Sequence, residues 1–181
     1  MQTQLIEIGY LQSKLREQAI RDTLTNLFNR RYLEETLERE LARAAREDYS
    51  VCVIMIDLDH FKRVNDTYGH EAGDDVLRLL GAALRESLRD VDLAARYGGE
   101  EFAIILPETD ASDGLAVAEK IRKRIESTAF QWRGSPIAVT ISAGVAALPH
   151  VGWDNTQLVR NADAALYTSK RSGRNRVTMA R

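Results

Sequence analysis

The chain has almost no cysteine and no long apolar run. Its single cysteine among 181 residues, Cys52, cannot form a disulfide within the chain, so we expect a packed core thiol in a reducing compartment. No apolar stretch is long enough to cross a bilayer, and the N-terminus lacks the apolar segment of a signal peptide. These absences predict a cytoplasmic location and no membrane partner for this chain.

An excess of charge of one sign is also missing. The formal net charge of −2 gives no general attraction to nucleic acid, so no nucleic-acid partner is expected. The sequence lacks the Gly-x-x-x-x-Gly-Lys loop of P-loop NTPases and any His/Cys cluster with zinc-ligand spacing. Two common classes of nucleotide-binding and metal-binding protein are therefore disfavoured. The length suits one domain with a sizeable core.

The apolar pattern predicts helices and strands in alternation. An unbroken apolar, β-branched run that begins at Val51 and ends in Asp57-Leu58-Asp59 indicates a strand buried on both faces. Further strands are expected at 91–97, 102–106, 137–143 and 176–179, and helices at 30–46, 61–64, 74–89, 111–127 and 156–170. This order describes an α+β sandwich of ferredoxin-like type, with a mainly antiparallel central sheet flanked by helices. Asp22 or Thr25 is expected to cap the helix at 30–46.

Residues 1–20 form a separate N-terminal segment ahead of a domain at 21–181. Apolar residues at Leu5, Ile8, Leu11 and Leu15 predict a helix with one apolar stripe, and the last three fit a short coiled-coil seam. One interpretation is a helix docked on its own domain. The other is a linker stub that pairs two subunits and follows an upstream sensor domain.

The stretch from Arg96 to Phe102 places two glycines and two glutamates between strand-forming runs. Gly98-Gly99 predicts a two-residue hairpin turn with both glycines at positive φ. Glu100 and Glu101 follow directly, and adjacent carboxylates repel unless a cation or a proton compensates. A solvated acidic turn is the ordinary interpretation of such a stretch by itself.

The end of the central strand supplies a further carboxylate. Strand ends are where α/β sheets place their ligands. If the hairpin flanks this strand, Asp57 meets Glu100 or Glu101. Carboxylate and carbonyl oxygens suit a hard cation such as Mg²⁺, which takes its other ligands from water and substrate phosphates. The set suits two-metal phosphoryl transfer.

Five separated blocks now occur in the order typical of one family. They are Asp22–Arg30, Asp57–Asp66, Gly69–Asp74, Gly98–Phe102, and a last group made of Ala162-Asp163, Ala165-Leu166-Tyr167, Lys170 and Gly173-Arg174-Asn175. The chain resembles the GGDEF domain of diguanylate cyclases, in its Gly-Gly-Glu-Glu-Phe form, from residue 22 to residue 177. The resemblance implies a fold similar to the palm of nucleotide polymerases. It also implies condensation of two GTP into cyclic di-GMP and two pyrophosphates, in a site shared by two subunits, so that 21–181 is a catalytic domain.

The resemblance also implies roles for single residues. Asp57, the carbonyl of Leu58 and a hairpin carboxylate would bind two Mg²⁺ ions per GTP, with Mn²⁺ as a substitute. Which of Glu100 and Glu101 is the ligand, and which helps to deprotonate the ribose 3′-hydroxyl, stays open, and we favour Glu100 as catalytic and metal-proximal. Further contacts to the triphosphate are implied for Lys62, Lys170 and Arg174. For Lys170 the alternative is a basic helix end that complements the macrodipole.

Guanine recognition would fall to Asn65 and Asp74. A carboxylate accepts the N1–H and N2–H₂ donors of guanine, so Asp74 favours guanine over adenine. The ordinary interpretations are a turn at Asn65 and a helix N-cap at Asp74. Gly98 and Gly99 would let the backbone approach the nucleotide. His70 and Phe61 complete the substrate candidates, although Phe61 also suits a core position.

The spacing Arg89-x-x-Asp92 matches the inhibitory product site of the family. Arg89 offers a fork of donors, Asp92 accepts from guanine, and Lys120 stands where many relatives carry arginine, which would weaken the site. An exposed local ion pair is the ordinary alternative. Two rival functions also remain: a domain that senses GTP or cyclic di-GMP without catalysis, and a domain that only dimerises.

Overall fold

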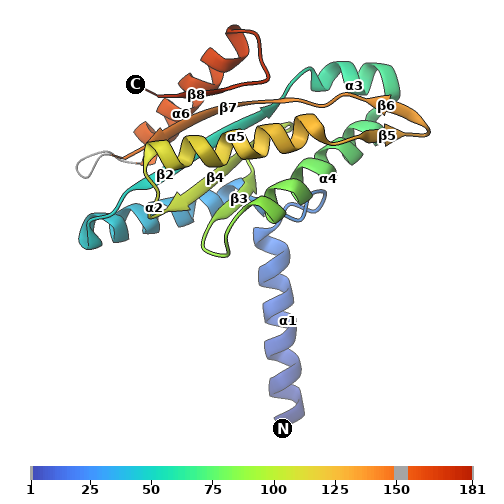
Figure 1. Ribbon diagram of the computed structural model, residues 1–181. Coiled ribbons are helices and arrows are strands. Elements are labelled where there is room, and N and C mark those ends of the chain that lie inside the picture. The colour runs from blue at the N-terminus through green and yellow to red at the C-terminus, as the bar shows by residue number, and fades with distance from the viewer. Residues whose placement is uncertain (1, 149–154, 181) are drawn as a thin grey trace.

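The computed structural model describes residues 2–148 and 155–180 and shows one six-stranded sheet with helices on both faces (Figure 1). The strand order is β1-β3-β4-β2-β7-β8. The central strand β2 (Val51–Leu58) pairs antiparallel with β4 (Glu101–Pro107) and with β7 (Ile141–Ala147). The predicted α+β class with a mainly antiparallel sheet is confirmed.

The connections follow the ferredoxin-like pattern. Helices α3 (Phe61–Tyr68) and α4 (His70–Ser87) lead from β2 to β3 (Leu93–Arg96), which forms a hairpin with β4. Helix α5 (Ala111–Ser127) leads from β4 back toward β7. The four strands therefore lie in the order β3-β4-β2-β7, as two interlocked βαβ units require. Short strands β1 (Phe28–Asn29) and β8 (Val177–Met179) extend the two edges in parallel pairs.

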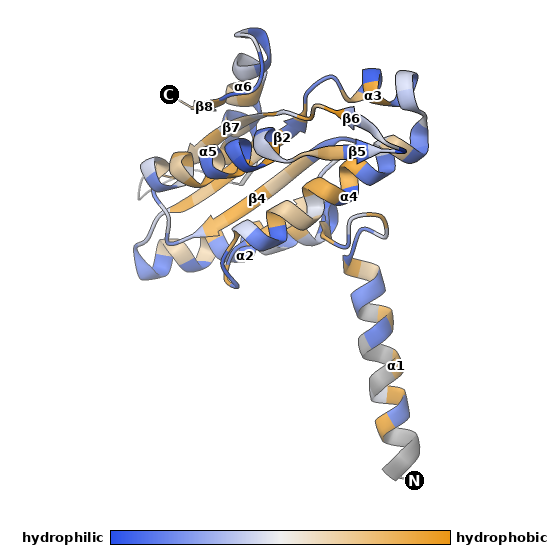
Figure 2. Cartoon of the chain, turned by 45° about the vertical axis from the view of Figure 1, so that its right-hand side comes forward, coloured by the Kyte–Doolittle hydropathy of each residue, from blue (hydrophilic) through white to orange (hydrophobic). Residues whose placement is uncertain are grey.

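Two apolar layers enclose the sheet. Every residue of β2 is buried. Alternate side chains of β2 project from opposite faces of the sheet. On one face, Ile54 and Ile56 pack with α4 and α5. On the other face, Val53 and Met55 pack with α2 (Arg30–Glu47) and α6 (Asn155–Arg171). Figure 2 shows the strands as the apolar centre between these helices. Cys52 lies in this core, where burial raises its thiol pKa to about 12.

Helix α1 (Gln2–Ile20) extends away from the domain (Figures 1 and 2). Its Ile8, Leu11 and Leu15 side chains are 52%, 52% and 64% exposed, so the stripe does not dock on its own domain. The side chain of Leu5 lies outside the described residues. Within the described part of the chain, no helix is long and apolar enough to cross a membrane.

Some predicted element boundaries are wrong. Helix α3 ends at Tyr68 rather than at Val64. Helix α4 begins at His70 rather than at Asp74, because Gly69 at a φ of 91° separates it from α3 and the new helix starts at once. Strand β7 begins at Ile141 rather than at Ile137. The segment Ser135–Ile137 (β6) instead pairs with Phe130–Trp132 (β5) in a separate two-stranded hairpin.

The predicted cap of α2 is also wrong. Neither Asp22 nor Thr25 caps this helix, because Asn29 stands immediately before it and its side chain accepts a hydrogen bond from the Tyr32 amide. Asp22 instead accepts from the amide and the hydroxyl of Thr25, at 2.8 and 2.7 Å, within the loop before α2.

The close packing of β7 against α6 generates a stability prediction. A methyl group at Gly144 would collide with the backbone of α6 at Ala162 and Leu166. We expect Gly144→Ala to lower the free energy of unfolding by at least about 3 kcal/mol, since the helix must move away. Gly9→Ala, which meets no atom within 4 Å in α1, serves as the control. Urea unfolding that shows equal stability for the two variants would contradict this packing.

Candidate active site

The end of β2 lies beside the turn that joins β3 to β4. Asp57 and Glu101 are direct cross-strand partners, so their side chains project from the same face of the sheet. The amide of Leu58 donates to the carbonyl oxygen of Glu100 at 3.3 Å. The structure therefore brings together the carboxylate of the central strand and the acidic turn, as the sequence predicted.

The turn itself differs from the predicted two-residue form. Arg96 pairs with Phe102, and the amides of Tyr97 and Gly98 both donate to the Glu101 carbonyl, at 2.8 and 3.1 Å. Three residues, 98–100, therefore form the turn, and neither Gly98 nor Gly99 has a positive φ.

The two glycines of this turn have different surroundings. A Cβ at Gly98 would lie 2.8 Å from Oε2 of Glu101, whereas a Cβ at Gly99 would meet no atom within 4 Å. Because Gly98 has no side chain, the Glu101 carboxylate can occupy this position without a steric clash. Within the described residues, no neighbouring atom requires a glycine at position 99.

The Asp57 carboxylate is the most perturbed group of the site. It is 5% exposed, and its pKa is raised to about 6, first by burial and further by Glu100 and Glu101. An ion pair with Lys170, at 2.8 Å between Nζ and Oδ2, acts in the opposite direction. The Lys170 ammonium thus lies in the site, and is more than the basic end of a helix.

The other basic candidates lie farther out. Lys62 forms an ion pair with Asp66 at 2.7 Å, and its side chain is 87% exposed. Arg174 is exposed in the turn after α6, with a φ of 63°. His70 is exposed at the first residue of α4. The structure does not join these three side chains to Asp57, and their predicted contacts to substrate stay predictions.

The donors around Asp57 suit a hard cation. Within the described residues, no group of three or more His, Cys, Asp or Glu side chains is arranged to hold a metal ion. The candidate ligands are Asp57, the Leu58 carbonyl and one carboxylate of the turn, and Mg²⁺ commonly takes only one or two protein carboxylates, with water and phosphate oxygens as its other ligands. Burial, Glu100 and Glu101 all oppose the ionisation of Asp57, and Lys170 offsets them only in part, so these residues fit such an ion.

The two guanine candidates lie on facing helices. Asn65 in α3 directs its Oδ1 atom at α4, where this oxygen is buried without a hydrogen-bond partner. A Cβ at Gly73 would collide with that oxygen, so this glycine gives it room. Asp74 is the next residue, and its carboxylate makes no hydrogen bond or ion pair within the described part of the chain. It lies inside α4, so it is not the N-cap. Phe61 is 9% exposed and packs in the core beside Gly73.

Arg89 and Asp92 pair with each other. The Asp92 carboxylate is 3% exposed and accepts from the Arg89 guanidinium at 2.7 Å and from its amide at 2.9 Å. Arg89 also donates to the carbonyl of Pro107 and the hydroxyl of Thr109, both at 3.1 Å. Lys120 is exposed on α5, and no described hydrogen bond or ion pair joins it to the pair. The local ion pair is therefore present, and the product site stays a prediction.

One contact of the turn was missed from the sequence. The Arg96 guanidinium donates to the Gly99 carbonyl at 2.8 Å and to Asp22, 74 residues away, at 3.2 Å. Burial raises the pKa of Asp22, but the bonds from Thr25 and the Arg96 charge outweigh it and leave this pKa below its usual value. Spacing cannot reveal such a pair, although the charge of Arg96 beside an acidic turn was a signal.

Comparison with known proteins agrees with this fold. Residues 19–176 match the family described as the diguanylate cyclase GGDEF domain, and the chain belongs to this family. It is 43% identical over 166 residues, 91% of this chain, to diguanylate cyclase DgcP of Pseudomonas aeruginosa.

Two solved structures are similar over most of the chain. The coiled coil and GGDEF domain of DgcB from Caulobacter crescentus, in complex with c-di-GMP, is 37% identical, with a TM-score of 0.93 over 99% of this chain and 95% of that one. The active GGEEF domain of a diguanylate cyclase from Vibrio cholerae is 37% identical, with a TM-score of 0.80 over 84% of this chain and 97% of that one. The chain spans only 24% to 48% of the length of the curated relatives that it matches.

The raised pKa of Asp57 predicts a pH dependence of stability in magnesium-free buffer. Its carboxyl binds a proton more tightly in the folded state, at a pKa of about 6, than in the unfolded chain, where the ordinary value is 3.8. The free energy of unfolding should therefore fall, by up to about 3 kcal/mol, as the pH rises through this window. Asp57→Asn should lose this pH dependence of the free energy of unfolding, and Asp75→Asn, at a half-buried residue of α4 that pairs with Arg78, should keep it. Urea unfolding across the window checks both, and parallel profiles for wild type and Asp57→Asn would contradict the shift.

Proposed function

We propose that the chain is a diguanylate cyclase domain that condenses two GTP into cyclic di-GMP and two pyrophosphates. The observation that carries the proposal is the buried Asp57 carboxylate, which lies opposite Glu101 and pairs with Lys170. A carboxylate with a raised pKa beside two others suits a cation-assisted phosphoryl site. The family membership and the c-di-GMP held by the Caulobacter structure support the same activity.

Asp57, the Leu58 carbonyl and a glutamate of the turn would hold Mg²⁺, or Mn²⁺ in its place. The metal, when bound, neutralises phosphate charge and lowers the pKa of the attacking ribose 3′-hydroxyl. We assign Glu100 to the proton of that hydroxyl and keep Glu101 in the site. Lys170, Lys62 and Arg174 bind the phosphates in this scheme.

Asn65 and Asp74 read the guanine. The Asn65 Oδ1 atom, which has no hydrogen-bond partner, is an acceptor, and the carboxylate of Asp74, the residue after Gly73, is a second acceptor. Guanine presents N1–H and N2–H₂ donors on one edge, which two neighbouring acceptors satisfy. Adenine offers an acceptor at N1 and would leave a carboxylate without a partner, so the pair selects GTP over ATP.

One domain holds one GTP, so two domains face each other in the proposed reaction. Each domain then supplies a 3′-hydroxyl to the α-phosphate of the other. The exposed Ile8, Leu11 and Leu15 stripe of α1 offers a seam by which two copies pair. A helix of this length pairs weakly by itself, so the contribution of α1 depends on protein concentration. An upstream sensor domain acting through α1 fits the same arrangement.

The rival function is a sensor domain that binds GTP or cyclic di-GMP without turnover. Such a sensor domain keeps a nucleotide site. Binding without turnover, however, does not require Glu100 and Glu101 beside the buried Asp57. A domain that only dimerises has no need for the partnerless acceptor at Asn65. The combination of both features favours the cyclase.

The direct test incubates the chain with GTP and Mg²⁺ and follows cyclic di-GMP and pyrophosphate over a protein concentration series. We expect specific activity to rise with concentration until the dimer is saturated. Glu100→Gln and Glu101→Gln should abolish turnover and keep the thermal midpoint near or above that of wild type, since repulsion is relieved. Glu38→Gln, on the exposed face of α2, is the control.

Three outcomes of this test would count against the proposal. Nucleotide binding without product at any concentration favours the sensor domain. Near-normal turnover in Glu101→Gln and Glu100→Gln removes these residues from the chemistry. A third variant, Asp74→Ser, is assayed with GTP and with ATP, and we expect it to lose affinity for GTP and to relax toward ATP. An unchanged preference for GTP over ATP in this variant removes Asp74 as the guanine reader.

Product inhibition at Arg89 and Asp92 is part of the same proposal. Cyclic di-GMP would take over the guanidinium fork of Arg89 and the Asp92 carboxylate, which now satisfy each other. Arg89→Ala should raise the product concentration needed for half inhibition by about ten-fold or more, since a charge-assisted contact contributes about 1.5–3 kcal/mol. The KM for GTP should stay near that of wild type. Arg43→Ala, which breaks an exposed pair with Glu47, is the control. Equal inhibition of wild type and Arg89→Ala would leave only the local ion pair.

A further inference from the structure

The turn between α6 and β8 has an unusual backbone. Gly173, Arg174 and Asn175 follow one another with φ angles of 116°, 63° and 45°. The left-handed conformation costs about 1–2 kcal/mol for a residue with a side chain, and it persists only where the surroundings impose it. Because Arg174 and Asn175 both carry side chains, contacts around the turn must hold this conformation.

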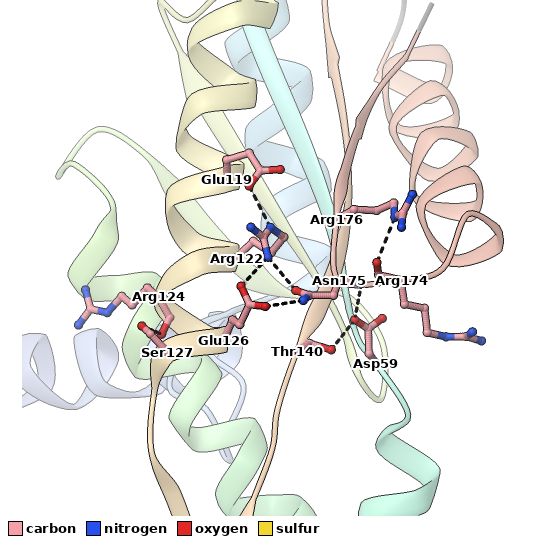
Figure 3. Close-up of polar contacts among 10 residues, drawn as sticks. All are labelled: Asp59, Glu119, Arg122, Arg124, Glu126, Ser127, Thr140, Arg174, Asn175 and Arg176. Carbon is pink, nitrogen blue, oxygen red and sulfur yellow. Dashed lines mark hydrogen bonds and ion pairs between the residues drawn. The ribbon is translucent and has the colours of Figure 1, made fainter.

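Asn175 makes hydrogen bonds to two separate elements (Figure 3). Its amide donates to Oδ2 of Asp59 at 2.9 Å, just beyond the end of β2. Its side-chain Nδ2 donates to Glu126 at 2.7 Å, and its Oδ1 accepts from Arg122 at 2.8 Å, both on α5. The turn is thus fastened to the central strand through its backbone and to α5 through one side chain.

The α5 side of this connection is itself fixed. The Arg122 side chain is 13% exposed and forms ion pairs with Glu119 at 2.9 Å and with Glu126 at 2.8 Å on its own helix. These bonds hold the guanidinium and the Glu126 carboxylate in one orientation. Asn175 therefore binds a donor, Arg122, and an acceptor, Glu126, whose orientations are already fixed by contacts within α5.

The Asp59 side of the connection is buried. Asp59 is 8% exposed, and it accepts from the hydroxyls of Thr140 at 2.8 Å and Ser142 at 2.6 Å, in addition to the Asn175 amide. Within the described residues, no Lys, Arg or His forms an ion pair with it. Neutral donors from β7, the segment before it and the turn thus satisfy this carboxylate. Asp59 lies two residues after Asp57 but anchors the turn instead of facing the acidic hairpin.

We propose that Asn175 and Asp59 are positioning residues for the triphosphate of the substrate, acting through Arg174. They hold the left-handed turn from which the Arg174 side chain extends away from the network (Figure 3). A guanidinium fork recognises phosphate oxygens only from a fixed distance and orientation. This inference rests on the proposed function, which assigns Arg174 to the phosphates, and it adds the residues that set the position of that arginine.

Asn175→Gly tests the connection without adding backbone strain. Glycine keeps the positive φ at no steric cost but removes both bonds to α5. We expect the affinity for 3′-deoxyguanosine triphosphate with Mg²⁺, which binds but has no attacking hydroxyl, to fall by about ten-fold. The KM for GTP should rise by a similar factor, with a smaller change in kcat. Asp48→Gly, at another left-handed residue with a φ of 57°, should leave both values unchanged.

A double-variant cycle separates positioning from general stability. If Asn175 acts through Arg174, Asn175→Gly should add nothing to the loss of affinity already caused by Arg174→Ala. The proposal is overturned if Asn175→Gly lowers the affinity by the same factor in the wild type and in Arg174→Ala. It is also overturned if Asn175→Gly alone does not lower the affinity. Should Asn175→Gly fail to fold, Glu126→Ala removes one of the two bonds between this side chain and α5, together with one of the ion pairs that orient Arg122, and takes its place in the cycle. The two proposals can fail separately. If the wild-type chain binds the deoxy analogue but forms no cyclic di-GMP, only the cyclase function is rejected. If Asn175→Gly keeps normal turnover and unchanged affinity, only the positioning role is rejected.

Discussion

The ion pair between Asp57 and Lys170 joins the central strand to α6, and the rest of the proposed site depends on it. Taking a carboxylate out of water is costly unless a cation offsets it. Here one ammonium faces Asp57 while Glu100 and Glu101 oppose its ionisation, so the pKa of Asp57 still rises to about 6. Within the described residues, Lys170 is the one cation that forms an ion pair with Asp57, and it does not restore the ordinary pKa. Mg²⁺ would supply what is missing, and the phosphates of GTP would then bring the negative charge that completes the balance.

The position of α6 has a second consequence, because the turn after it carries Arg174 and Asn175. Gly144 allows α6 to pack closely against β7, and Ser169 of α6 donates to the Ala143 carbonyl of β7 at 2.8 Å. The helix end is thereby fixed to the strand that flanks β2. A turn that starts from a fixed helix end and is bonded to both Asp59 and α5 has little freedom. The proposed phosphate contact of Arg174 thus depends on packing and hydrogen bonds made by residues outside the acidic hairpin.

The sequence predicted the parts of the structure that depend on local pattern. The apolar run of β2 and the stripe of α5 gave elements close to the observed Val51–Leu58 and Ala111–Ser127, because burial repeats with a fixed period. The pairing of Asp57 with the turn also followed from the strand order. The form of that turn did not follow, because the amide of Leu58 on another strand holds the Glu100 carbonyl. Contacts such as Asp22 with Arg96, or Asn175 with α5, join residues with no sequence periodicity between them, so no local signal predicts them.

Four aspartates show how the surroundings of a carboxylate separate structural from chemical roles. Asp22 is satisfied by Thr25 and Arg96, and its pKa is lowered. Asp59 is satisfied by two hydroxyls and an amide, and Asp92 by the guanidinium and amide of Arg89. Each of these three has partners for its charge within the chain, so none needs a ligand to be stable. The pKa of Asp57, by contrast, is raised despite its ion pair, because burial and two neighbouring glutamates outweigh one lysine. A carboxylate left in that state gains stability from an added cation, and this physical difference, more than its place in a motif, marks Asp57 as the centre of the site.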